Sequence, residues 1–110
     1  MTTSIITVNH IEGFHCWPDA PDTLRYLKDR HRHIFVIECN FKVSHDDRQI
    51  EIISQQHQIE EFIRDRHGIP AGFGSMSCEA IAREIVDFYT DCISCTVRED
   101  GFGGATVTRR

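Results

Sequence analysis

Three histidines are the residues whose type and spacing point most directly to chemistry. His31 and His33 are separated by one residue at the start of an apolar, alternating segment. Residues two apart on a strand point to the same face, so one neutral nitrogen of each could reach a single cation at about 2.0–2.1 Å. His15 ends an earlier segment and would lie beside them in an antiparallel hairpin. Three histidines with one open position are typical of a catalytic zinc site; the alternative is that His31 and His33 are exposed in a basic loop.

Two further groups of side chains could bind a ligand or move protons. Glu99 ends a segment on whose apolar face it also lies. Its carboxylate is either in water at the sheet edge or receives the donors of a ligand. Asp65 and His67 end a segment with helical periodicity. They are either an acid–base pair or surface charges, with the histidine favoured near a helix C-terminus.

The five cysteines form no disulfide framework, because their number is odd and small for this length. On a strand, the sulfurs of Cys92 and Cys95 would lie on opposite faces. Without a second C-x-x-C pair, we expect both to be small buried residues, like Cys39 and Cys78. Cys16 follows the first of the three histidines, and a metal bound there would lower the pKa of its thiol; the alternative is again a core residue.

The composition is that of a globular chain, and it excludes several classes. The 110 residues are 40% hydrophobic and 26% charged, and predict a single domain over residues 1–110. A formal charge of −5 disfavours nucleic acid as a partner. No apolar run reaches the roughly 18 residues of a membrane span, and the N-terminus lacks a signal-peptide pattern. We therefore expect a cytoplasmic protein with reduced cysteines and no membrane contact.

Periodicity indicates the elements that position these residues. Alternation predicts strands, at Ser4–Phe14, His33–Val43, Cys92–Glu99 and Ala105–Thr108, with Gln49–Ile52 as a short hairpin partner. Apolar residues at i, i+3 and i+4 predict helices, at Gln55–Arg66 and from Ser75 or Ser77 to Tyr89. Residues Thr23–Arg32 are expected to form a loop or one helical turn. Strand pairs separated from a helix pair predict an α+β fold with an antiparallel sheet.

Motifs along nearly the whole chain resemble one known family. His15 at a strand end, followed by His31 and His33 opening the next strand, is similar to the 6-pyruvoyl-tetrahydropterin synthase and 6-carboxy-tetrahydropterin synthase family. Residues 77–82 resemble that family's Thr-Ser-Glu-Asn-Leu-Ala helix start. Residues 97–100 resemble its Val-x-Glu-Thr strand end.

The resemblance implies a tunnelling fold, in which a four-stranded antiparallel sheet (ββααββ) carries two helices on one face. It implies that His15, His31 and His33 hold zinc, and that Glu99 anchors the aminopyrimidinone edge of a pterin. Family members act on dihydroneopterin triphosphate, and zinc polarises the side-chain hydroxyls of this substrate. They assemble as trimers stacked into homohexamers, with sites at subunit boundaries.

The chain departs from the family where protons are moved. Arg32 stands where the family has a glycine, and residues 26–28 lack the family's catalytic cysteine. In place of an adjacent Asp-His pair, Asp65 and His67 have a residue between them. One interpretation is a zinc-dependent 6-carboxy-tetrahydropterin synthase-like lyase that cleaves a carbon–oxygen or carbon–carbon bond, with proton transfer by His67, Asp65 and Cys16. Another is a non-catalytic module that binds a pterin or purine-like ring. A third, an interaction protein, requires the histidines to be incidental.

Overall fold

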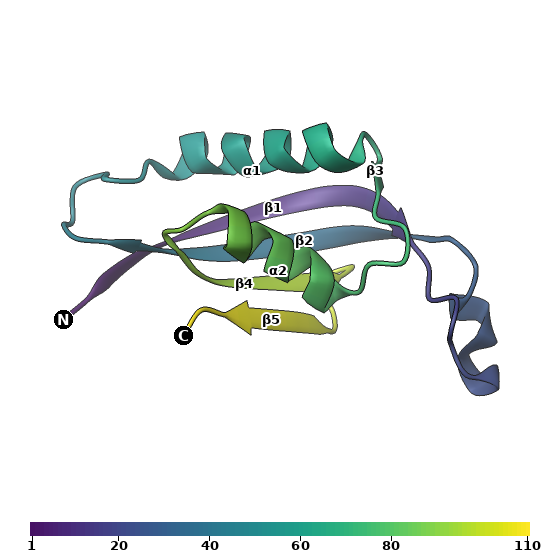
Figure 1. Cartoon of the computed structure of the whole chain (residues 1–110). Helices are drawn as coiled ribbons and strands as arrows, with labels where there is room; N and C mark the ends of the chain where they lie inside the picture. The colour runs from purple at the N-terminus through teal and green to yellow at the C-terminus, as the bar shows by residue number, and fades with distance from the viewer.

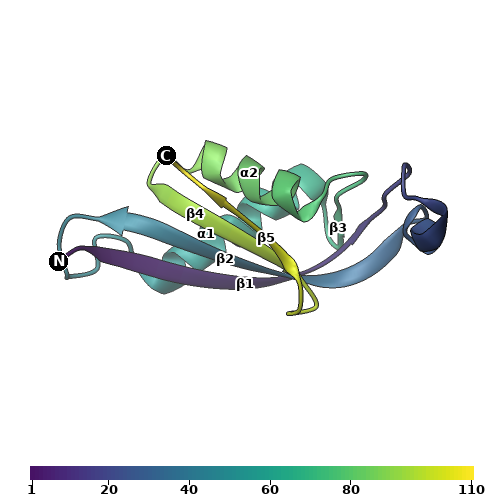
Figure 2. The same cartoon turned by 90° about the horizontal axis from the view of Figure 1, so that it is seen from below.

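The computed structural model describes all 110 residues as one sheet with two α-helices packed on the same face (Figures 1 and 2). The elements are β1 (Thr3–His15), the 3₁₀ helix η1 (Asp22–Leu27), β2 (His31–Val43), α1 (Ile52–His67), β3 (Ala71–Gly72), α2 (Cys78–Phe88), β4 (Cys92–Glu99) and β5 (Gly104–Thr108). The predicted α+β class is confirmed. Neither α-helix has the length and hydropathy needed to cross a membrane.

The strands form a mixed sheet in the order β3-β1-β2-β4-β5. β1 and β2 pair antiparallel along all 13 residues of each, and β4 pairs antiparallel with both β2 and β5. β3 lies parallel to β1, where Ala71 is opposite Gly13. The sheet therefore has five strands and is mixed, whereas the tunnelling fold that the family resemblance implies has four antiparallel strands. A two-residue strand is too short to leave an alternation pattern, so periodicity does not reveal it.

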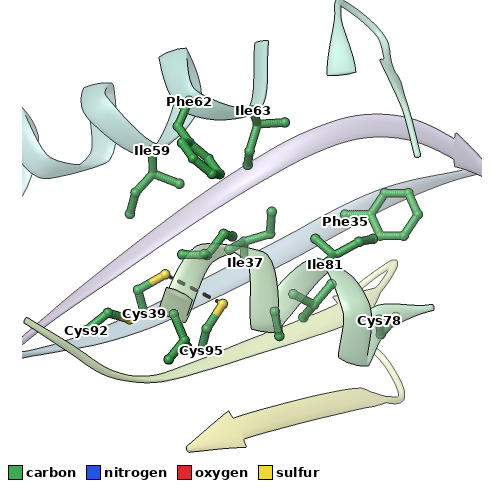
Figure 3. Close-up of a cluster of buried hydrophobic side chains, with 14 of the residues drawn as sticks. Phe35, Ile37, Cys39, Ile59, Phe62, Ile63, Cys78, Ile81, Cys92 and Cys95 are labelled. Atoms are coloured by element: carbon green, nitrogen blue, oxygen red, sulfur yellow. Dashed lines mark hydrogen bonds between the residues drawn. The ribbon is translucent and has the colours of Figure 1, made fainter. Parts of the chain in front are cut away.

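The core lies between the sheet and the helices, and alternation on β2 determines which side chains enter it. The odd-numbered residues of β2 from Phe35 to Phe41 are at most 1% exposed. They pack against apolar residues of both helices, among them Ile59 and Phe62 of α1 and Ile81 of α2 (Figure 3). Burial of one such side chain stabilises the fold by about 1.5–3 kcal/mol. The same parity directs His15 of β1 and both histidines of β2 to the helix-covered face, whereas His10 of β1 is exposed.

The start of α1 differs from the prediction. The expected hairpin strand at Gln49–Ile52 is wrong, because α1 begins at Ile52 and the Glu51 carboxylate caps it by accepting a hydrogen bond from the Ile53 N–H at 2.6 Å. α1 thus extends beyond the predicted Gln55–Arg66 at both ends. In α2, Ser77 is the N-cap, one of the two residues expected, and its hydroxyl accepts from the Ala80 N–H at 3.1 Å.

The cysteines of β4 are both buried, although their spacing predicts opposite faces. The register between β2 and β4 shifts beside Cys92, and a bulge of this kind redirects a side chain. Cys92 and Cys95 therefore both lie in the core near Cys39, whose sulfur is 3.7 Å from that of Cys95 (Figure 3). The prediction of opposite faces is wrong, and the prediction of buried cysteines is confirmed. The hydrogen bond with Cys39, together with burial, raises the pKa of the Cys92 thiol.

Candidate metal centre

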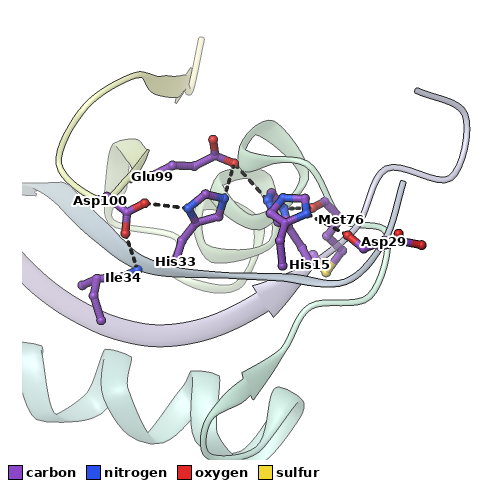
Figure 4. Close-up of polar contacts among 8 residues, drawn as sticks. His15, Asp29, His33, Ile34, Met76, Glu99 and Asp100 are labelled. Atoms are coloured by element: carbon purple, nitrogen blue, oxygen red, sulfur yellow. Dashed lines mark hydrogen bonds and ion pairs between the residues drawn. The ribbon is translucent and has the colours of Figure 1, made fainter. Parts of the chain in front are cut away.

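The side chains of His15, His31, His33 and Glu99 converge at one end of the sheet. Figure 4 labels His15, His33 and Glu99 of this group. His15 is the last residue of β1 and lies directly opposite His31, the first residue of β2. Glu99 ends β4 and lies opposite Phe35, two residues along β2 from His33. The three imidazole rings are 4.6–5.2 Å apart between centroids. The predicted proximity of the three histidines is observed, and Glu99 joins them.

The spacing of the polar atoms suits a single cation. One ligand atom from each of the four side chains lies within 4.8 Å of the other three. An oxygen of Glu99 is 2.9 Å from Nε2 of His15 and 3.6 Å from Nε2 of His33. Ligand atoms around a tetrahedral zinc ion are about 3.3 Å apart, given metal–ligand distances near 2.0–2.1 Å. Small side-chain rotations would therefore be enough to close the site around a metal ion.

The other ring nitrogen of each histidine is held by an acceptor. Nδ1 of His15 is 3.0 Å from the Met76 carbonyl oxygen, and Nδ1 of His31 is 2.8 Å from the Asp29 carbonyl oxygen. A carbonyl oxygen only accepts, so each of these Nδ1 atoms carries the proton and donates it. In a neutral imidazole, Nε2 then keeps a free lone pair. This is the orientation that histidine ligands of metals normally have.

His33 is oriented by a carboxylate instead. Its Nδ1 donates to Oδ2 of Asp100 at 2.7 Å, and the other Asp100 oxygen accepts from the Ile34 N–H at 2.8 Å (Figure 4). These two hydrogen bonds lower the pKa of Asp100, and the one from His33 has the larger effect. Asp100 has a φ of 56°, in the left-handed region, where Asp and Asn are enriched. It completes a carboxylate–histidine pair behind the cluster.

Two of the inward-facing nitrogens are buried without a hydrogen-bond partner. Nε2 of His15 and Nε2 of His33 have no donor or acceptor in hydrogen-bonding geometry, although an oxygen of Glu99 lies close to both. When the imidazoles are neutral and carry their proton on Nδ1, the lone pair of each Nε2 faces the Glu99 oxygen, so these short contacts are not hydrogen bonds. An unpaired buried polar atom costs free energy. A cation between these atoms would remove that cost, so the four residues fit a metal ion.

The cluster forms one wall of a pocket of about 660 Å³. Cys16, Trp17, Cys78 and Phe102 are among the other lining residues. Burial, followed by the nearby charge of Glu99, raises the pKa of the Cys78 thiol to about 12. Cys16 is half-buried, and its backbone N–H donates to the Gly74 carbonyl at 2.8 Å. Of the residues considered for proton transfer, Cys16 is the one that lines this pocket.

Asp65 and His67 lie elsewhere and do not pair with one another. Nε2 of His67 is 2.9 Å from Oε1 of Glu84, across the interface between α1 and α2. The imidazole packs on Phe73, and Asp65 is exposed on α1. Neither residue lines the pocket beside the histidines. Within one chain, the predicted Asp65–His67 pair is therefore replaced by a His67–Glu84 pair.

Sequence reasoning overlooked two carboxylates that hold histidines, Asp100 and Glu84. Asp100 follows Glu99 directly, and a second acidic residue at a strand end beside a histidine pair is a usable signal. Glu84 lies 17 residues from its partner and leaves no such signal. The two carbonyl oxygens that hold His15 and His31 belong to backbone, which no residue type identifies.

No protein-family model and no curated protein sequence matches this chain.

Proposed function

We propose that the protein is a zinc-dependent lyase similar to 6-carboxy-tetrahydropterin synthase, acting on a pterin or a related ring compound. The observation that carries this proposal is the orientation of the histidines. Each Nδ1 is held by an acceptor, and the ligand atoms converge within 4.8 Å. Three neutral imidazoles with a nearby carboxylate suit zinc among the common metals. The resemblance of residues 77–82 and 97–100 to the pterin synthases supplies the substrate class.

The residues around the cluster suggest how a ligand would be held. A pocket of about 660 Å³ is within the usual range for small-molecule sites, about 300–1,000 Å³. Zinc in this position would supply Lewis-acid polarisation of a substrate hydroxyl. Glu99, whose side chain is 37% exposed, would either complete the metal site or accept the paired N–H groups of an aminopyrimidinone ring. Cys16 is placed to exchange a proton with a bound ligand.

An oligomer would supply the remaining proton-transfer groups. The resemblance implies sites at subunit boundaries, so we propose that His67 and Glu84 of one copy approach the metal centre of another within a hexamer. β5 is paired on one side only and forms an open sheet edge, and proteins rarely leave such edges uncovered. Light scattering should give six times the chain mass of 12.7 kDa. A stable monomer at micromolar concentration would refute this assembly.

A non-catalytic pterin- or purine-binding module is the second candidate. One observation favours it: of the three residues considered for proton transfer, His67 and Asp65 do not line the pocket and only Cys16 does. The zinc site and the pocket would be kept for binding, and proton transfer would have been lost.

Metal analysis and a turnover assay test both candidates. Elemental analysis of the purified protein should give one zinc per chain, with none in a His31→Ala/His33→Ala variant. His10→Ala/His57→Ala is the matched control, because both of these histidines are exposed and outside the cluster. The zinc-loaded protein is then incubated with dihydroneopterin and with its triphosphate, and products are separated by chromatography. Turnover that the metal-site variant loses supports the lyase, binding without turnover supports the module, and the absence of zinc refutes both.

A further inference from the structure

The charged residues around the pocket are all acidic. Glu79, Glu99 and Asp100 line it, and no lysine or arginine does. A bound divalent cation would add two positive charges against these three carboxylates, which leaves the site with a net charge of about −1 when the histidines are neutral. A ligand that carries several negative charges would therefore be repelled by the pocket as a whole.

The three arginines next to cluster residues in the sequence are engaged elsewhere. The guanidinium of Arg32 is 2.6 Å from the Glu12 carboxylate, and that of Arg98 is 3.8 Å from the Glu38 carboxylate. The guanidinium of Arg30 lies over the Phe14 ring, 3.9 Å from its centroid. None of the three lines the pocket. The walls that one chain provides therefore offer no arginine for bidentate recognition of phosphate.

The N-terminus of α2 is the other feature that could attract phosphate, since backbone N–H groups there carry partial positive charge. The Ser77 hydroxyl already accepts from one of these groups, the N–H of Ala80. Glu79 lies in the first turn of the helix and lines the pocket. Its carboxylate opposes the partial charge at the point where a phosphate would bind.

The uncharged part of the lining suits a flat ring. Trp17 and Phe102 line the pocket, with 46% and 82% of their surface exposed. Exposed aromatic rings next to inward-facing polar groups provide stacking surface for a planar ligand. Ser75 and Ser77 add hydroxyl groups that can donate or accept.

From these observations we infer that the site takes an uncharged or cationic ring compound with hydroxyl or amino groups and disfavours its phosphorylated forms. This inference rests on the proposed function and narrows its substrate class to unphosphorylated pterins or purine nucleosides. It runs against the triphosphate substrate that the family resemblance implies.

Binding measurements on the zinc-loaded protein test the inference. Trp17 is the single tryptophan of the chain and lines the pocket, so its fluorescence reports on ligands. Neopterin is compared with dihydroneopterin triphosphate, and guanosine with its triphosphate, between about 50 and 500 mM potassium chloride. The unphosphorylated compounds should bind at least as tightly as the triphosphates. Added salt should strengthen triphosphate binding, since it screens repulsion.

A charge reversal in the pocket provides the matched comparison. Glu79→Lys should raise affinity for the triphosphates about tenfold. The substitution changes the charge at this position by two units, and these act through screened Coulomb interactions on about four negative charges of the ligand, at a distance near 8 Å. Glu61→Lys makes the same change on the exposed surface of α1, away from the pocket, and should alter affinity less than twofold.

Three outcomes separate the inference from the proposed function. Triphosphates that bind more than tenfold tighter than their parent compounds, and more weakly as salt rises, would overturn the inference while leaving the proposed function in place. If no ring compound binds, the proposed function and the inference both fail. If the unphosphorylated compounds bind at least as tightly as the triphosphates, both are supported.

Discussion

Replacement of Asp100 by Asn tests whether the carboxylate behind His33 determines metal affinity. Asp100 accepts from two donors, Nδ1 of His33 at 2.7 Å and the Ile34 N–H at 2.8 Å. An Asn side chain has one acceptor oxygen, so its NH₂ group must face one of these donors. If the oxygen stays on Ile34, then His33 moves its proton to Nε2, which can no longer bind a metal. The left-handed φ of 56° is compatible with Asn, so the turn should be preserved.

The expected loss follows from the exposure of this contact. Outer-shell partners of histidine ligands typically contribute a factor of about 10–100 in metal affinity. The Asp100 side chain is 46% exposed, and water partly replaces the lost acceptor, so the effect should lie near tenfold, at the lower end of that range. The free energy of unfolding of the metal-free protein should change little, because exposed contacts of this kind contribute little to stability.

Competition with a fluorescent zinc chelator measures this affinity directly. The control is Asp46→Asn, which makes the same change at the opposite end of the sheet, where Asp46 accepts from the Thr3 hydroxyl at 2.6 Å. Zinc affinity of the control should equal that of the wild type. If Asp100→Asn binds zinc within twofold of the wild type, then the carboxylate does not set the proton position on His33, and the reasoning fails.

Three further predictions concern cysteines and packing. A thiol reagent should modify Cys16 rapidly in the folded protein and all five cysteines after denaturation, because the other four are buried; a second fast thiol would contradict this. Because the pKa of Cys92 is raised on folding, its contribution to stability is complete well below pH 9.0, its ordinary pKa, and is lost as pH rises above it. Between pH 8 and 10 the unfolding free energy should therefore fall by about 1.4 kcal/mol less in total in Cys92→Ala than in wild type, as measured by denaturation. Gly13→Ala should lower the unfolding free energy by about 1–3 kcal/mol, since a Cβ there would lie 2.9 Å from the Phe73 ring. In the control Gly103→Ala, the new Cβ meets no atom within 4 Å, so the loss should be much smaller. Equal unfolding free energies for the two variants would show that the sheet can shift at Gly13 to make room for the methyl group.

The parts of the fold that the sequence predicts well are those set by local periodicity. Alternation along β2 correctly places its odd-numbered residues in the core, and this parity brings His31 and His33 to one face. The apolar spacing in α1 and α2 likewise identifies both helices. The hairpin of β1 and β2 then brings His15 opposite His31. The candidate site was predictable to this extent because strand period and strand pairing are sufficient to place three side chains.

The remaining features depend on contacts between distant residues. β3 exists because β1 offers a partner, and the burial of Cys92 follows from an irregularity in the pairing of β2 with β4. Alternating apolar residues around Glu51 predict a strand, but the Glu51 side chain caps the N-terminus of α1 and the segment forms a helix. His67 contacts Glu84 because the end of α1 lies beside α2 in the folded chain. None of these results can be read from spacing alone.

The convergence of β1, β2 and β4 at the cluster also has a consequence for how the sheet opens. A metal bound to His15, His31 and Glu99 would fasten the ends of three neighbouring strands, so that fraying of any one strand would require the metal to be released. Backbone amides at this end should then exchange with deuterium more slowly when zinc is present. The opposite end, where Thr3 pairs with Val43, lies about 40 Å away along the strands and should exchange at an unchanged rate. A slip of one residue between β1 and β2 would turn His15 to the other face, so the ion would also select the native strand register.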